Sequence, residues 1–187
     1  MAELTVNLQP GLLGVLFHLF SNGRINKDTL IKNQALLLEL EGKQDLHVLL
    51  ADDDEDDRQF FTDAINVVAP KLKLTTVQNG EELIYKLKNK ITDLPDVIFL
   101  DLNMPYKNGM ECLKEIKSVE ALKNIPVLIY STSAHRDQVE ITYRNGANLY
   151  IQKPSSYEGI IRVLKTIFTL PVSEWFEQPS REKFVLK

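Results

Sequence analysis

Residues 96–105 read DVIFLDLNMP, and this stretch decides the fold class. The run from Val97 to Leu100 is apolar at every position, which is typical of a strand covered on both faces of a parallel sheet. An acid, Asp101, follows the run directly, and Asn103 and Pro105 come next. A carboxylate placed where a buried strand ends is the first sign of chemistry in this chain.

The same unit of apolar strand and amphipathic helix recurs on both sides of this stretch. Strands are predicted at residues 47–51, 72–77, 96–102, 125–130 and 148–152. Helices are predicted between and after them, at residues 55–68, 81–91, 109–119, 136–145 and 156–168. Five strands alternating with five helices indicate an α/β fold with a doubly wound parallel sheet.

Polar side chains follow four of the predicted strands. In parallel sheets of this kind, ligands bind beyond the carboxyl ends of the strands, so these side chains are expected to meet at one edge. They are Asp52, Asp53, Asp101, Ser131, Thr132 and Lys153.

Such a group is suited to accepting a phosphoryl group. Three converging carboxylates repel one another unless a cation lies among them, and a hard divalent ion with oxygen ligands, most plausibly Mg²⁺, fits that role. A carboxylate can attack phosphorus to form an acyl phosphate, and a metal and a lysine can neutralise the charge of the transferred group. A nearby hydroxyl can then bond the new phosphoryl oxygens.

Other polar residues nearby have simpler explanations. The acids Glu55, Asp56 and Asp57 lie at the start of a predicted helix, where the helix dipole alone favours negative charge. Ser133 is predicted to cap the helix that follows it. Cys112, the single cysteine, is expected to be a small apolar residue within a helix.

The motifs resemble the receiver domain of two-component response regulators. They are ADDD at 51–54, DLNMP at 101–105, a hydroxyl after PVLIY, and Lys153-Pro154, and the resemblance covers residues 45–170. It implies a flavodoxin-like sheet with strand order 2-1-3-4-5.

The resemblance also implies roles for these residues. Asp101 would accept the phosphoryl group, and the ammonium of Lys153 would pair with that group. The peptide bond between Lys153 and Pro154 is typically cis in the family. The metal ligands would be Asp52, Asp53, Asp101 and the backbone carbonyl of Asn103.

Two further residues would carry the switch. Ser131 takes the hydroxyl position that turns toward the phosphoryl group, and Tyr150 takes the position of an aromatic residue that fills the vacated space. The face near the fourth helix, fifth strand and fifth helix would then change.

Three functions are compatible with this group of residues to different degrees. A stand-alone receiver would take its phosphoryl group from a histidine kinase or phosphotransfer protein and signal through protein contacts. An aspartyl-phosphate phosphatase needs a second aspartate two residues after the nucleophile as general acid, and that position is Asn103. A DNA-binding regulator would use the amino-terminal segment, although its basic residues are few.

The flanks extend beyond a minimal receiver. Residues 1–44 are predicted to form a helical hairpin for dimerisation or a partner, and residues 171–187 form a tail whose aromatic residues, including Trp175 and Phe184, are suited to docking on a surface. The apolar stretch at 11–20 is too short to span a membrane, and a cytoplasmic location is expected.

Overall fold

The computed structural model describes residues 46–89, 93–170 and 173–186. The chain divides into two compact units, and the second unit, Gln44–Lys187, contains all of these residues. The hairpin predicted at 1–44 lies outside the described residues. No helix within the described ranges is long and apolar enough to cross a bilayer.

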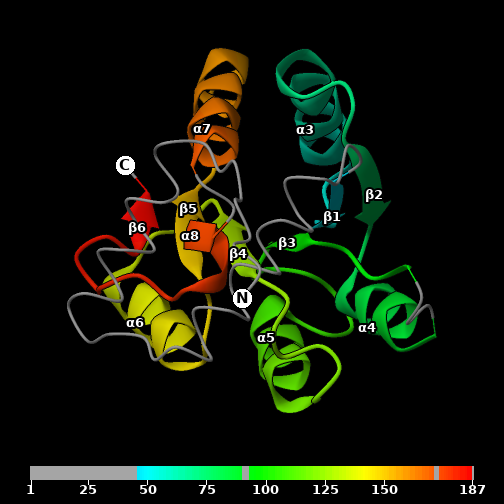
Figure 1. Cartoon of the computed structure of the whole chain (residues 1–187), viewed down its shortest axis with the longest axis vertical. Coiled ribbons are helices and arrows are strands. Elements are labelled where there is room, and N and C mark those ends of the chain that lie inside the picture. Colours follow the sequence, from blue (N-terminus) through cyan, green and yellow to red (C-terminus); the bar gives the residue numbers. More distant parts are fainter. Residues whose placement is uncertain (1–45, 90–92, 171–172, 187) are drawn as a thin grey trace, which may run out of the picture. The chain divides into compact units, whose positions relative to one another are not determined.

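Strands and helices alternate along the second unit (Figure 1). The strands are β1 (His47–Ala51), β2 (Lys73–Val77), β3 (Val97–Leu100), β4 (Val127–Ser131), β5 (Leu149–Gln152) and β6 (Val185–Leu186). The helices are α3 (Glu55–Val68), α4 (Gly80–Asn89), α5 (Gly109–Ser118), α6 (Arg136–Arg144), α7 (Tyr157–Thr169) and the short α8 (Ser173–Phe176).

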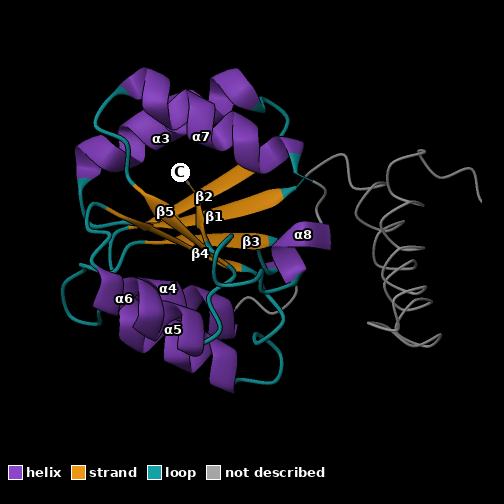
Figure 2. Ribbon diagram, turned by 90° about the vertical axis from the view of Figure 1, so that its left-hand side faces the viewer, coloured by secondary structure: helices purple, strands orange, loops and turns teal. Residues whose placement is uncertain are grey.

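The strands form one parallel sheet in the order β2-β1-β3-β4-β5-β6. The predicted order 2-1-3-4-5 is therefore confirmed, with β6 added beside β5. Helices α3 and α7 cover one face of the sheet, and α4, α5 and α6 cover the other (Figure 2). This two-sided cover explains why β1, β3 and β4 are buried along their whole length and read as continuous apolar runs.

Two apolar cores hold the three layers together, one on each face of the sheet. Leu49, Ile98 and Ile129 belong to the core that also contains Leu113 and Ile116 of α5. The neighbouring strand residues belong to the opposite core, where the ring centroids of Phe61 and Phe99 lie 5.0 Å apart, edge to face. Side chains alternate between the two cores along each strand, as the period of two requires.

The carboxyl-terminal tail packs against this sheet and adds β6 to it. The Phe184 side chain is fully buried, and its backbone oxygen accepts a 2.8 Å hydrogen bond from the Tyr150 amide. Trp175 is also buried and donates its indole N–H to the carbonyl oxygen of Ile167, at 3.2 Å. The tail aromatics therefore extend the core instead of standing free.

The prediction that Ser133 caps the following helix is wrong. Helix α6 begins after His135, and no side chain caps it there. The hydroxyl of Ser133 instead accepts a 3.4 Å hydrogen bond from the amide of His135. This is a local turn of the kind that serine forms as an alternative to a helix cap.

Candidate functional site

The ends of four strands bring the predicted site residues together. Three of these residues are fixed by a backbone hydrogen bond that continues the sheet ladder past the strand. The backbone N–H of Asp52 donates to the carbonyl oxygen of Val77 at 3.1 Å, and the backbone N–H of Asp101 donates to the carbonyl oxygen of Ala51 at 2.9 Å. Lys153 donates to the carbonyl oxygen of Ser131 at 2.8 Å. The backbone therefore determines where these side chains begin.

The three predicted carboxylate ligands of the metal form a compact group. One carboxylate oxygen from each of Asp52, Asp53 and Asp101 lies within 4.8 Å of the other two. Asp52 and Asp101 are buried, whereas Asp53 is exposed. The Nζ atom of Lys153 lies 2.7 Å from Oδ2 of Asp52 and 3.0 Å from Oδ2 of Asp101. The predicted lysine, metal ligands and acceptor thus share one site.

A fourth carboxylate belongs to this site although the sequence reading assigned it to the helix dipole. Oδ2 of Asp57, in the first turn of α3, lies 2.8 Å from Nζ of Lys153. Asp57 lies in the first turn of the helix that directly follows the acid pair. This closeness in sequence to Asp52 and Asp53 could have indicated that Asp57 belongs to the same site. The dipole explanation holds for Glu55 and Asp56, which are exposed.

The charges in this site are strongly unbalanced. Four carboxylates belong to this site, and three of them, those of Asp52, Asp57 and Asp101, lie within 3.0 Å of the ammonium of Lys153. Burial raises the pKa of Asp52 from its ordinary value of 3.8 to about 6, against the opposing effect of Lys153. Burial lowers the pKa of Lys153, but its hydrogen bonds with Asp52 and Asp57 and the charge of Asp101 outweigh burial and raise it overall. The raised pKa of Lys153 shows that the carboxylates stabilise a positive charge here, and the raised pKa of Asp52 shows that its buried charge is costly.

The carboxylate oxygens of Asp52, Asp53 and Asp101 are suitable ligands for a hard divalent ion. Carboxylate oxygens are the preferred ligands of Mg²⁺ in proteins, and neutralising buried negative charge offsets the cost of holding it in the fold. Asn103 follows the same strand, and its backbone N–H donates to Oδ1 of Asp101 at 3.2 Å. This bond fixes the orientation of the acceptor carboxylate.

The loop after Asp101 is held closely against the strand end. The amide of Gly109 donates to the carbonyl oxygen of Leu102 at 3.0 Å. A Cβ atom on Gly109 would lie 2.0 Å from the carbonyl oxygen of Asp101, so only glycine allows α5 to begin this close to the acceptor.

The two predicted switch residues lie on the neighbouring strands β4 and β5, with Ser131 opposite Gln152 and Tyr150 opposite Ile129. The hydroxyl of Ser131 is fully buried and has no hydrogen-bond partner within the described part of the chain. Tyr150 is also fully buried, and its hydroxyl donates to the carbonyl oxygen of Ser133 at 2.5 Å. The ring of Phe184 packs against it with centroids 6.2 Å apart. The Tyr150 side chain is therefore already buried in this structure, whereas the resemblance implied that it turns inward when Asp101 is phosphorylated.

The expected cis bond before Pro154 is not present. Every peptide bond between described residues is trans, which is the lower-energy form even before proline. Lys153 reaches the carboxylates with this trans geometry.

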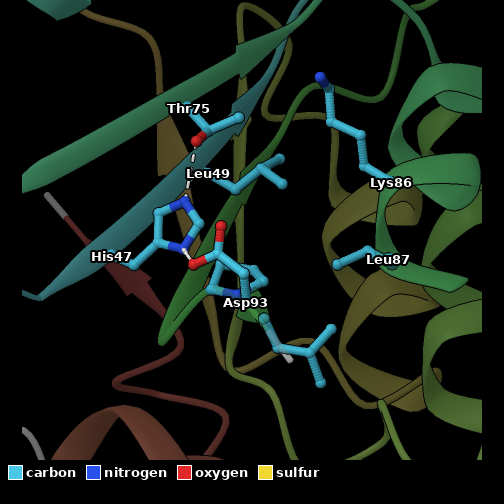
Figure 3. A pocket seen from close by; sticks show the side chains of 8 residues that line it. His47, Leu49, Thr75, Lys86, Leu87 and Asp93 are labelled. Atoms are coloured by element: carbon cyan, nitrogen blue, oxygen red, sulfur yellow. Dashed lines mark hydrogen bonds and ion pairs between the residues drawn. The ribbon is translucent and has the colours of Figure 1, made fainter. Parts of the chain in front are cut away.

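Two pockets lie near opposite ends of the strands. A surface pocket of about 580 Å³ borders the carboxylate site and is lined by Asp57, Thr132 and Lys153 among others. A pocket of about 40 Å³ at the amino end of β1 contains His47, whose Nε2 lies 2.8 Å from Oγ1 of Thr75 (Figure 3). The smaller pocket is separate from the carboxylate group.

Comparisons with known proteins agree with this arrangement. A family model for the response regulator receiver domain matches residues 48–165. The probable methanogenesis regulatory protein FilR2 of Methanothrix harundinacea (strain 6Ac) is 39% identical over 74 residues, covering 40% of this chain and 48% of that protein. The chain thus spans about half the length of this relative.

Solved structures are similar over more of the chain. The phosphorylated cyanobacterial phytochrome response regulator RcpA has a TM-score of 0.63 and 32% identity, covering 68% of this chain and 94% of that one. The Mn²⁺-bound form of response regulator Rcp1 has a TM-score of 0.62 and 27% identity, covering 72% and 97% respectively.

Proposed function

Because this chain belongs to the response regulator receiver domain family, we propose that it accepts a phosphoryl group on Asp101 and signals through protein contacts that depend on it. The observation that carries the proposal is the meeting of one ammonium with the buried carboxylates: Nζ of Lys153 lies 3.0 Å from Oδ2 of Asp101 and 2.7 Å from Oδ2 of Asp52. A phosphoryl group on Asp101 would therefore have a cation beside it from the start.

The transfer itself is a displacement at phosphorus. A carboxylate oxygen of Asp101 forms a bond to the phosphorus, and the bond from phosphorus to the donor breaks, with its electron pair leaving on the donor. A histidine kinase or phosphotransfer protein is the expected donor. Lys153 donates to the phosphoryl oxygens, and the buried hydroxyl of Ser131 gains an acceptor there.

The metal requirement follows from the acids. Asp52, Asp53 and Asp101, with the backbone carbonyl of Asn103, would hold Mg²⁺, whose charge would neutralise the phosphoryl oxygens. The similar protein Rcp1 has a Mn²⁺-bound form, which supports a divalent ion at this position.

Signalling would pass through Tyr150. Its inward position is already favoured by Phe184 and by the bond to Ser133. A phosphoryl group that holds Ser131 toward Asp101 would stabilise this position further, because both side chains lie on the same face of the neighbouring strands β4 and β5. The readout would be the face near α6, β5 and α7, where β6 pairs with β5.

A signalling role is favoured over turnover of outside substrates. The general acid of an aspartyl-phosphate phosphatase would stand at Asn103, and an amide cannot transfer a proton in that role. The homodimer and the DNA-binding alternative both depend on residues 1–44, which lie outside the described residues, and both stay predictions.

A small phosphodonor tests the proposal without knowledge of the kinase. We expect acetyl phosphate with Mg²⁺ to label the wild-type protein, and a chelator to abolish the labelling. Label that resists alkali and hydroxylamine would not be an acyl phosphate and would refute the proposal.

A further inference from the structure

We propose that Asp57 is a positioning residue for phosphoryl transfer, which holds the ammonium of Lys153 ready for the phosphoryl oxygens on Asp101. The inference rests on the proposed function and adds to it a residue from outside the acid pair and the acceptor.

The start of α3 fixes where Asp57 lies. Oδ1 of Asp54 caps the helix by accepting the amide of Asp57 at 3.0 Å. One residue later, Nη1 of Arg58 donates to the carbonyl oxygen of Asp52 at 2.9 Å, which ties the helix to the end of β1. The first turn of α3 is thereby anchored on both sides of Asp57, and its carboxylate is held at 2.8 Å from Lys153.

The number of donors on Lys153 matches its partners. An ammonium has three N–H donors, and the Nζ atom lies within 3.0 Å of three carboxylates, those of Asp52, Asp57 and Asp101. The lysine side chain is 6% exposed, so water has little access to it. Three anionic partners and burial together restrict a side chain that is otherwise among the most flexible.

Asp57 differs from the other two partners in what happens when the site is used. Asp52 and Asp101 belong to the group that would hold the metal, and Asp101 would also carry the phosphoryl group. A metal and an ammonium have charges of the same sign and would compete for these two carboxylates. Asp57 stays available to Lys153 throughout, because it lies outside the three-acid group.

The consequence is a lysine that is already oriented when the phosphoryl group arrives. Without Asp57, the ammonium would have to be ordered during the transfer. The entropy cost of that ordering would offset part of the free energy gained from its bonds to the phosphoryl oxygens. Asp57 thus acts through Lys153 and needs no contact with the transferred group.

The test compares Asp57→Asn with Asp56→Asn, alone and in a Lys153→Gln background, at a Mg²⁺ concentration that saturates each variant. Asp56 is an exposed acid in the same helical turn, so it controls for the loss of charge near the helix start. We expect Asp57→Asn to slow labelling by acetyl phosphate roughly tenfold, the scale of one charge-assisted hydrogen bond, and Asp56→Asn to change the rate less than about twofold. In the Lys153→Gln background, Asp57→Asn should have no further effect, because the two residues act as one unit.

A second measurement needs neither metal nor phosphodonor. In metal-free protein, we expect the ammonium protons of Lys153 to exchange with solvent faster in Asp57→Asn than in wild type or Asp56→Asn, as observed by NMR of the Nζ nitrogen. Unchanged exchange, an unchanged or faster labelling rate, or an effect of Asp57→Asn that persists without Lys153 would each overturn the inference. Absence of labelling in wild type would instead refute the proposed function, and the role of Asp57 in transfer with it.

Discussion

Replacing Asp52 by asparagine is expected to stabilise the metal-free protein. Asp52 is fully buried, and burial raises its pKa from 3.8 to about 6. Its charged form is therefore less favourable in the folded protein than in the unfolded chain. Asparagine has nearly the same shape and keeps an oxygen for the 3.2 Å bond from the backbone amide of Asp54. It loses the charged contact with Lys153, whose effect on the pKa of Asp52 is smaller than that of burial, and Lys153 keeps Asp57 and Asp101 as partners.

The size of the effect follows from the two pKa values. The difference between 3.8 and about 6, at about 1.4 kcal/mol per pKa unit, corresponds to about 3 kcal/mol. Above pH 6, Asp52 is ionised in both states, and the folded state carries the whole cost. As the pH falls from 6 to 3.8, the folded state binds the proton first, so the wild type gains stability that the asparagine variant does not.

Urea denaturation of metal-free protein measures this directly. We expect Asp52→Asn to raise the free energy of unfolding by about 3 kcal/mol at pH 7.5, with a smaller difference at pH 5. Asp53→Asn is the matched control, since its side chain is exposed, and a change below about 1 kcal/mol is expected there. A less stable Asp52→Asn protein at pH 7.5 would show that the charged form of Asp52 supports the fold, and the electrostatic reasoning would be wrong.

Three other changes test separate parts of the structure. Mg²⁺ should raise the midpoint temperature of thermal unfolding of the wild type at pH 7.5. This shift should become smaller below pH 6, because Asp52 then binds a proton and loses the charge that makes it a ligand. A shift of equal size at pH 5 would argue against Asp52 as a ligand. Phe184→Ala should lower the free energy of unfolding, measured by urea denaturation, by about 3–5 kcal/mol because the ring is fully buried. Lys183→Ala should lower it by less than about 0.5 kcal/mol because Lys183 is exposed. Equal losses would mean that the tail is not part of the core. Gly109→Ala should cost more than about 2 kcal/mol, since its Cβ would lie 2.0 Å from the carbonyl oxygen of Asp101, and a neutral effect on thermal unfolding would contradict that approach.

The sheet and most of the site follow from patterns within short segments. Continuous apolar strands such as VIFL at 97–100 need cover on both faces, and this predicts a parallel sheet. Carboxyl ends of parallel strands share one edge, so Asp52, Asp101 and Lys153 were expected to meet, and they do. These inferences succeed because strand direction alone places the residues.

The features that sequence reading missed depend on contacts between distant segments. β6 contains only Val185 and Leu186, and two residues have no period to detect. It forms because burial of Phe184 places the strand beside Tyr150. Asp57 was missed for a related reason: its partner lies 96 residues away, and the helix dipole explained its position equally well.

Identification of the phosphorylated residue shows whether Asp101 is the acceptor. After labelling by acetyl phosphate with Mg²⁺, borohydride reduction converts a phosphoaspartate to homoserine, and peptide mass spectrometry locates that residue. We expect homoserine at position 101 in the wild type and no labelling of Asp101→Asn. Homoserine at position 52, 53 or 57, or full labelling of Asp101→Asn, would contradict this assignment.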